Sequence, residues 1–300
     1  MNPSLWDEAK WSEGRIIRGK YRIVGRLGSR GIGTVYKAEH VRVGHPCALK
    51  VLNYELADDA SCVQRFQCAA LLAWKLHHPN AVSIEDVDLA EDDRPFFTME
   101  FVEGQTLRNL IAADGRLTIP RAGAIVWQVV SALAAAHELG IVHGRINPDN
   151  IMLVRTPQGE QSKVCDFGVA KTLQGWMHDG DTMSVSRGGT IVCKPAYMSP
   201  EAVKAITQDG RSDIYSLGVV MYQMLTGQLP FSADEDHKMM EAHLRLVPTP
   251  IESVRIDIPP ALAGLVMKCL EKPWDQRPAN CRVLARETEK FRAELEDIAF

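Results

Sequence analysis

One short polar stretch, from His143 to Asn150, most constrains what this chain can fold into. It reads His-Gly-Arg-Ile-Asn-Pro-Asp-Asn and follows a long apolar segment with helical spacing. Four apolar residues with the composition of a strand come directly after it. The tripeptide Asp166-Phe167-Gly168 then follows, sixteen residues after Asn150. The tripeptide alone carries little weight, but at this distance from Asn150 it is a strong signal.

A glycine cluster lies between two strand-like segments nearer the N-terminus. Residues 21–27 and 34–39 have the pattern of a β-hairpin, and the turn between them, 28–33, reads Gly-Ser-Arg-Gly-Ile-Gly. A dinucleotide-binding loop would instead lead from a strand into a helix. A further apolar strand is predicted at 47–52, and it carries Lys50 among its apolar residues.

Together these motifs resemble those of eukaryotic-type protein kinases. The polar stretch is similar to the catalytic loop H-R-D-L-x-x-x-N, the tripeptide matches D-F-G, and the strand that carries Lys50 is similar to V-A-I-K. The resemblance runs from about residue 21 to residue 284 and is greatest to bacterial Hanks-type Ser/Thr kinases. It implies an α+β, bilobal protein kinase fold, with a small β-rich N-lobe that carries the αC helix at 59–77 and a larger, mainly helical C-lobe.

The resemblance also implies a domain organisation. The extension before the N-lobe is expected to pack its tryptophans on that lobe. The apolar stretch 122–136 is too short to span a bilayer, which favours a buried helix. The amphipathic helix from Ala279 leaves three alternatives open: core packing, a homodimer contact, or a lead into further sequence. The predicted units are an N-terminal extension (1–20), the N-lobe (21–102), the C-lobe (103–290) and the end of a C-terminal helix (291–300).

A nucleotide site between the lobes follows from the same resemblance. Lys50 would hold the α- and β-phosphates, and Asn150 and Asp166 would bind Mg²⁺. Because Ala69 stands at the family's αC glutamate position, Lys50 would lose its usual partner or pair with Asp166. The implied cofactor is ATP, bound weakly, with the need for Mg²⁺ left open. The residues assigned to nucleotide binding are Gly28, Gly31, Gly33, Val35, Ala48, Lys50, Met99, Glu100, Val102 and Met152.

Other matches are to structural positions of the family. Asp213 would anchor the backbone of the catalytic loop. Arg277 would pair with Glu201, the glutamate of the family's A-P-E motif, because a buried charge needs a partner. His143 and Phe167 complete this structural set.

Several chemical positions depart from the family. Arg145 stands where the family has its catalytic aspartate, and Asn147 stands at the catalytic-loop lysine. Gly144 replaces the arginine that reads a phosphorylated activation loop. Losing a general base slows a reaction by about 10²–10⁴-fold. A guanidinium cannot be deprotonated in a protein, so Arg145 cannot act as the base.

Some positions leave alternatives. Arg30, at the second glycine position, either obstructs the phosphates or contacts them directly, and together with Arg145 it would reduce dependence on a metal ion. Asp149 could replace the missing base, although a surface turn residue is the preferred interpretation. Either Lys194 replaces the family's threonine, or Gly189-Thr190 is that pair, displaced by four residues.

These departures lead us to predict a pseudokinase, that is, a protein without enzymatic activity. It would act as a signalling scaffold or allosteric regulator of a protein partner such as an active kinase. The alternative is a weakly active or unorthodox ATP-dependent protein phosphotransferase (a Ser/Thr kinase) that uses Lys50, Asp166 and Asn150. A nucleotidyl transferase, with ATP bound in another orientation, is a related alternative.

Composition limits the partners and the compartment. A net charge of -4 over 300 residues gives no basis for a nucleic-acid binder. Seven scattered cysteines without a C-x-x-C pair favour a reducing compartment. The first residues lack the basic and apolar regions of a signal peptide. We therefore expect a cytoplasmic protein with no nucleic-acid partner and no membrane segment within these residues.

Overall fold

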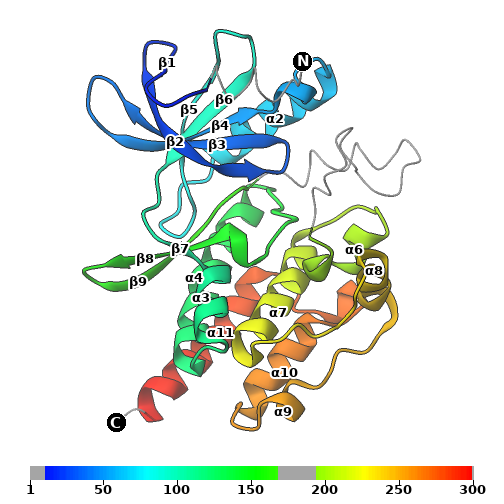
Figure 1. Cartoon of the computed structure of the whole chain (residues 1–300). Coiled ribbons are helices and arrows are strands. Elements are labelled where there is room, and N and C mark those ends of the chain that lie inside the picture. The colour runs from blue at the N-terminus through cyan, green and yellow to red at the C-terminus, as the bar shows by residue number, and fades with distance from the viewer. Residues whose placement is uncertain (1–10, 168–193, 299–300) are drawn as a thin grey trace.

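The chain folds into two lobes, one built on a sheet and one mainly helical (Figure 1). The computed structural model describes residues 11–167 and 194–298, without the side chains of residues 30 and 290–298. The predicted α+β, two-lobed architecture is confirmed. The polar stretch from His143 to Asn150 lies in the larger lobe, directly before the strand that starts at Ile151.

The smaller lobe is a six-stranded antiparallel sheet with the strand order β1-β2-β3-β4-β6-β5. Its glycine cluster forms a tight hairpin in which Arg30 pairs with Gly33, so Gly31 and Ile32 make the turn. Gly31 has φ +64°, a backbone conformation that favours glycine in two-residue hairpins. The strands are β1 (Ile16–Ile17), β2 (Tyr21–Arg30), β3 (Gly33–His40), β4 (Pro46–Leu52), β5 (Ile84–Leu89) and β6 (Pro95–Glu100).

The described part of the N-terminal extension packs on this sheet. β1 pairs with β2, and the Trp11 ring stacks on Tyr36 with 5.5 Å between ring centroids. Trp11 is buried in the same apolar cluster as the strands. The predicted packing therefore occurs for Trp11, whereas Trp6 lies outside the described residues.

One helix, α2 (Ala60–Trp74), covers the sheet on the side of the site. The side chain of Asp59 accepts hydrogen bonds from the first free N–H groups of this helix. Cys62, Phe66, Ala70 and Ala73 recur at helical spacing and are buried. The helix ends three residues before the predicted limit at residue 77, and a short 3₁₀ turn (Tyr54–Leu56) precedes it.

The larger lobe is built around α7 (Gly210–Thr226), in which fourteen of seventeen residues are buried. α4 (Ile119–Glu138), α10 (Pro260–Cys269) and α11 (Cys281–Ile298) pack against it. The remaining elements are α3 (Leu107–Asp114), α6 (Pro200–Val203), α8 (Asp236–Arg245), α9 (Ile251–Val254), strands β7 (Gln105–Thr106), β8 (Ile151–Thr156) and β9 (Gly159–Val164), and 3₁₀ turns η2 (Pro148–Asn150), η3 (Pro195–Tyr197) and η4 (Trp274–Gln276).

Within the described residues, α4 is the one helix long and apolar enough to cross a membrane by length and composition. Nine of its apolar side chains, between Ile119 and Ala136, are buried in the lobe. α4 packs on α11 and α7, which is the packing of a core helix.

A buried ion pair ties the segment around Glu201 to the core. Arg277 donates to both carboxylate oxygens of Glu201, at 2.8 and 3.0 Å, and Ser212 donates to the same carboxylate at 3.1 Å. Burial by itself would raise the pKa of Glu201, but the Arg277 guanidinium lowers it below its ordinary value. The ion pair predicted from the sequence is therefore present, with its charges compensated.

Arg277→Ala is expected to lower the free energy of unfolding by about 3–5 kcal/mol, because Glu201 would keep a buried charge without a partner. Chemical denaturation measures the loss. The matched control is Arg282→Ala, which breaks an exposed pair with Glu138. That change is expected to cost less than about 1 kcal/mol. An equal loss of unfolding free energy in the two variants would contradict a stabilising role for the buried Arg277–Glu201 pair.

Candidate active site

The catalytic loop is held by one buried carboxylate from α7. Asp213 accepts the backbone N–H groups of His143 and Gly144, at 2.9 and 2.6 Å, and lies 2.8 Å from Nε2 of His137. Its side chain is fully buried. Asp213 therefore occupies the anchoring position that the resemblance implied.

The loop is joined to the D-F-G segment through His143. Its Nε2–H donates to the carbonyl of Cys165 at 2.8 Å, and its ring packs edge-on against Phe167. Burial lowers the pKa of His143 below its ordinary value. A backbone hydrogen bond from Cys165 to Asn150 adds a second link. Two motifs sixteen residues apart therefore lie side by side.

The two asparagines of the loop hold the backbone of Arg145. The Nδ2 groups of Asn147 and Asn150 both donate to its carbonyl at 2.9 Å. Asn147 also accepts the N–H of Asp149 and caps the turn η2. The sequence reasoning treated Asn147 only as a lost lysine. The Asn-Pro-Asp pattern, typical of an Asx turn, could have revealed this structural role.

Gly144 has a structural role that the sequence reasoning also missed. Its backbone has φ +68°, in the left-handed region. Residues with a side chain adopt this conformation at a steric cost, whereas glycine does not. Gly144 therefore suits the bend that presents its N–H to Asp213, whatever it loses by lacking the family's arginine.

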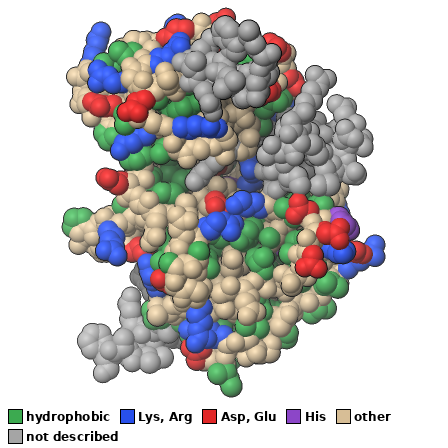
Figure 2. Space-filling view, in the orientation of Figure 1, with side chains coloured by type: hydrophobic (Ala, Val, Ile, Leu, Met, Phe, Trp, Pro, Cys, Tyr) green, Lys and Arg blue, Asp and Glu red, His purple; other side chains and the backbone are tan. Residues whose placement is uncertain are grey.

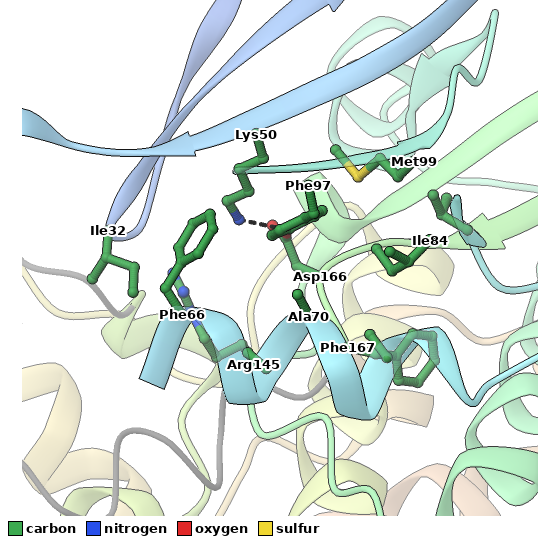
Figure 3. Close-up of a pocket in the computed structure, with 13 residues that line it drawn as sticks. Ile32, Lys50, Phe66, Ala70, Ile84, Phe97, Met99, Arg145, Asp166 and Phe167 are labelled. Atoms are coloured by element: carbon green, nitrogen blue, oxygen red, sulfur yellow. Dashed lines mark hydrogen bonds and ion pairs between the residues drawn. The ribbon is translucent and has the colours of Figure 1, made fainter. Parts of the chain in front are cut away.

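Lys50 and Asp166 form the charged centre of the site. Nζ of Lys50 donates to Oδ1 of Asp166 at 2.7 Å, and both side chains are more than nine-tenths buried (Figure 3). Of the two predicted alternatives for Lys50, the structure has the pair with Asp166. Ala69 lines the same cavity. A longer side chain at position 69 would therefore point into the cavity that Lys50 also lines.

An apolar slot adjoins this centre. Most of the residues assigned to nucleotide binding line it, and it shares Val82, Met99 and Asp166 with the cavity beside α2. Gly31 and Gly33 lie in the hairpin and line neither cavity. Leu27, Val82, Phe101 and Cys165 were missed. All of these except Val82 adjoin a predicted residue or the D-F-G motif. The predicted residues that line the slot are Gly28, Val35, Ala48, Met99, Glu100, Val102 and Met152.

The residues present fit a nucleotide and a divalent cation. The slot has apolar walls of a kind that suits a flat aromatic base. Within the described ranges, no cluster of three or more His, Cys, Asp or Glu residues could hold a metal ion. Mg²⁺ sites commonly combine one or two protein ligands with phosphate oxygens. Asn150 and Asp166 would form such a site together with a bound triphosphate.

Asp149 is held by two cations. Nε of Arg108 donates to it at 2.6 Å, and Lys194 donates to the same carboxylate oxygen. Burial alone would raise the pKa of Asp149, but the hydrogen bonds from Lys194 and Arg108 lower it. This supports a structural residue over a replacement base. Lys194 thus contacts Asp149.

Other predicted features lie outside the description. Gly168 and the pair Gly189-Thr190 fall within residues 168–193, and the side chain of Arg30 is likewise not described.

The fold and site together define a two-lobed protein with an apolar slot beside a charged centre, and comparison with known proteins names its family. The model of the protein kinase domain matches residues 21–287, so the chain belongs to the protein kinase domain family. Serine/threonine-protein kinase pkn3 of Myxococcus xanthus is 37% identical over 288 residues, covering 95% of this chain and 51% of pkn3. Pkn1 of the same organism is 40% identical over 266 residues, which cover 87% of this chain and 37% of Pkn1.

Solved structures agree with this assignment. The kinase domain of Mycobacterium tuberculosis PknI superposes with a TM-score of 0.72 at 26% identity, covering 94% of this chain and 99% of that domain.

Serine/threonine-protein kinase PknB of Mycolicibacterium smegmatis is 36% identical over 265 residues, which cover 87% of this chain and 41% of PknB. The chain spans about half or less of the length of these curated relatives.

These relatives overturn the prediction of a pseudokinase. Chains 36–40% identical over most of this one are named serine/threonine-protein kinases, which points to an enzyme. The prediction was wrong because it gave decisive weight to the missing base at Arg145. The structure keeps Lys50, Asp166 and Asn150 together around the loop.

Asp149→Asn is expected to lower the free energy of unfolding at neutral pH by about 1 kcal/mol, because the pair with Arg108 and Lys194 is partly exposed. The folded pKa of Asp149 is depressed, so this stabilisation is present above the unfolded value of about 3.9 and is lost as the pH falls through the folded value. Denaturation of both proteins at pH 7 and in acid measures it. A difference that stays constant into acid would contradict the ion pair.

Proposed function

We propose that this chain is an ATP-dependent phosphotransferase that transfers the γ-phosphoryl group to serine or threonine hydroxyls of a protein. The observation that carries the proposal is the buried Lys50–Asp166 pair at 2.7 Å, beside an apolar slot between the lobes. The relatives named as Ser/Thr kinases support the reaction class. The proposal is the enzymatic alternative to the overturned pseudokinase.

Each retained residue has a task in this reaction. The slot around Val35, Ala48 and Met152 would bind the adenine ring. Lys50 would hold phosphate oxygens by charge, and Asp166 and Asn150 would hold Mg²⁺. The bound cation supplies positive charge that neutralises the phosphates. The loop backbone, fixed by Asp213, keeps Asn150 in place relative to Asp166.

The transfer is expected to be slow. Position 145 offers no carboxylate to orient and deprotonate the substrate hydroxyl, which costs about 10²–10⁴-fold in rate. Phosphoryl transfer depends mainly on positioning and on stabilisation of charge, so the loss of a base reduces the rate without abolishing it. Weak ATP binding is part of the same proposal. Lys50 lacks a partner on α2 and pairs with Asp166, so it competes with Mg²⁺ for that carboxylate.

Transfer of radiolabelled phosphate from ATP to the chain itself and to generic protein substrates tests the proposal. We expect slow incorporation that Lys50→Ala and Asp166→Ala abolish. Arg145→Asp is expected to raise the turnover number by at least about tenfold, because it restores a carboxylate at the base position. Lys268→Ala, an exposed change on α10, is the control and should leave the rate unchanged. Incorporation that survives in both the Lys50 and Asp166 variants would contradict this site.

A second variant tests the charge balance around Lys50. Ala69→Glu places a carboxylate in the cavity that Lys50 lines, so Lys50 would gain a partner on α2. We expect a several-fold rise in turnover with Ala69→Glu. Ala69→Gln, of equal size and without charge, is the matched control. An equal response to both changes would show that bulk, and not charge, acts at this position.

A further inference from the structure

The side chain of Arg145 crosses from the catalytic loop to the hairpin of the other lobe. A Cβ atom built on Gly31 would lie 2.9 Å from Nη1 of Arg145, so the guanidinium lies directly against the hairpin turn. Figure 3 shows this side chain pointing upward toward Phe66, on the same side of the cavity as Ile32. Gly31 therefore leaves room for a cation, besides providing the turn conformation.

The backbone of Arg145 is fixed on both sides. Its N–H donates to Nδ1 of His143 at 3.2 Å, and its carbonyl accepts the amide groups of Asn147 and Asn150. The preceding residue is held by Asp213. The guanidinium thus starts from an immobilised backbone, which lowers the entropy lost when it binds a ligand.

In this loop the positive charge lies at position 145, whereas the family carries it at position 147. The family places a lysine at the position of Asn147, whose amide here is committed to the backbone of the loop. Among the described residues that line the cavity, the cationic side chains are Lys50 and Arg145. Asp166 is the acidic side chain that lines it, so the lining carries a net positive charge of one.

We propose that Arg145 binds the terminal phosphate of a nucleoside triphosphate and, with Lys50, lets the site hold ATP without a divalent cation. The identity of the ligand rests on the proposed function. A guanidinium presents a planar fork that matches two oxygens of one phosphate, and such charge-assisted pairs are strong. Lys50 reaches the phosphates from strand β4 while Arg145 reaches them from the loop, so the two cations lie on opposite lobes.

The proposal predicts selectivity by the number of phosphates. Arg145 contacts the phosphate that ATP has and ADP lacks, whereas Lys50 serves both nucleotides. Without metal, ATP should therefore bind more tightly than ADP by about tenfold, the contribution of one hydrogen-bonded charged contact. With Mg²⁺ present, the cation neutralises the same phosphate and the contribution of Arg145 shrinks.

Isothermal titration with ATP and with ADP, each in EDTA and in Mg²⁺, tests the proposal. The wild type should prefer ATP in EDTA. Arg145→Gln should remove that preference and leave ADP affinity unchanged, while Arg145→Lys should retain part of it. Arg155→Gln, which removes an equal charge from the exposed face of β8, is the matched control and should behave as the wild type. Unchanged ADP binding in the Arg145→Gln variant shows that its cleft is folded.

Three results would overturn the proposal. They are equal affinity of the wild type for ATP and ADP in EDTA, a preference for ATP that persists in Arg145→Gln, and strict dependence of ATP binding on Mg²⁺. The proposed function fails separately. An Arg145-dependent preference for ATP without any phosphate transfer would sink the kinase proposal alone, and transfer without that preference would sink the phosphate contact alone.

Discussion

The site depends on one buried carboxylate, that of Asp213 on α7. Two backbone N–H groups of the catalytic loop point at it, and they would otherwise be buried donors without acceptors. α7 is the buried centre of the larger lobe, so the loop is attached to the most tightly packed part of that lobe. From the loop, hydrogen bonds continue through His143 to Cys165, next to Asp166. A continuous series of hydrogen bonds therefore fixes the position of Asp166 relative to α7.

The two lobes meet electrostatically at Lys50 and Asp166. Lys50 lies on β4, and Asp166 lies in the loop that follows β9. Nζ of Lys50 and Oδ1 of Asp166 are 2.7 Å apart, so the ion pair links the two lobes. In the absence of an acidic residue at Ala69, the aspartate serves both as partner of Lys50 and as the proposed metal ligand. This double role is the physical basis of the weak nucleotide binding that we propose, since a bound cation must compete with Lys50 for the same carboxylate.

The catalytic loop keeps its geometry although its chemistry differs. Gly144 suits a left-handed backbone, Asn147 caps the turn that follows, and Arg145 carries a fixed positive charge toward the hairpin. An interpretation that counts missing functional groups concludes that activity is lost, as ours did. In the structure, Gly144 and Asn147 shape the loop, and Arg145 carries its charge to the hairpin. The relatives named as kinases point to an enzyme.

The sequence by itself determined the fold class, the hairpin, the helix before the catalytic loop and the pairing of Glu201 with Arg277. The first three follow from local periodicity and from motifs whose spacing is read directly along the chain, whereas the pairing of Glu201 with Arg277, 76 residues apart, follows from the family resemblance alone. Only the tertiary structure decided that Lys50 pairs with Asp166, that Asp149 is held by Arg108 and Lys194, and that Arg145 reaches Gly31. The physical reason is distance along the chain: these partners are separated by 41 to 116 residues, and no local pattern specifies which charged side chains the folded core brings together.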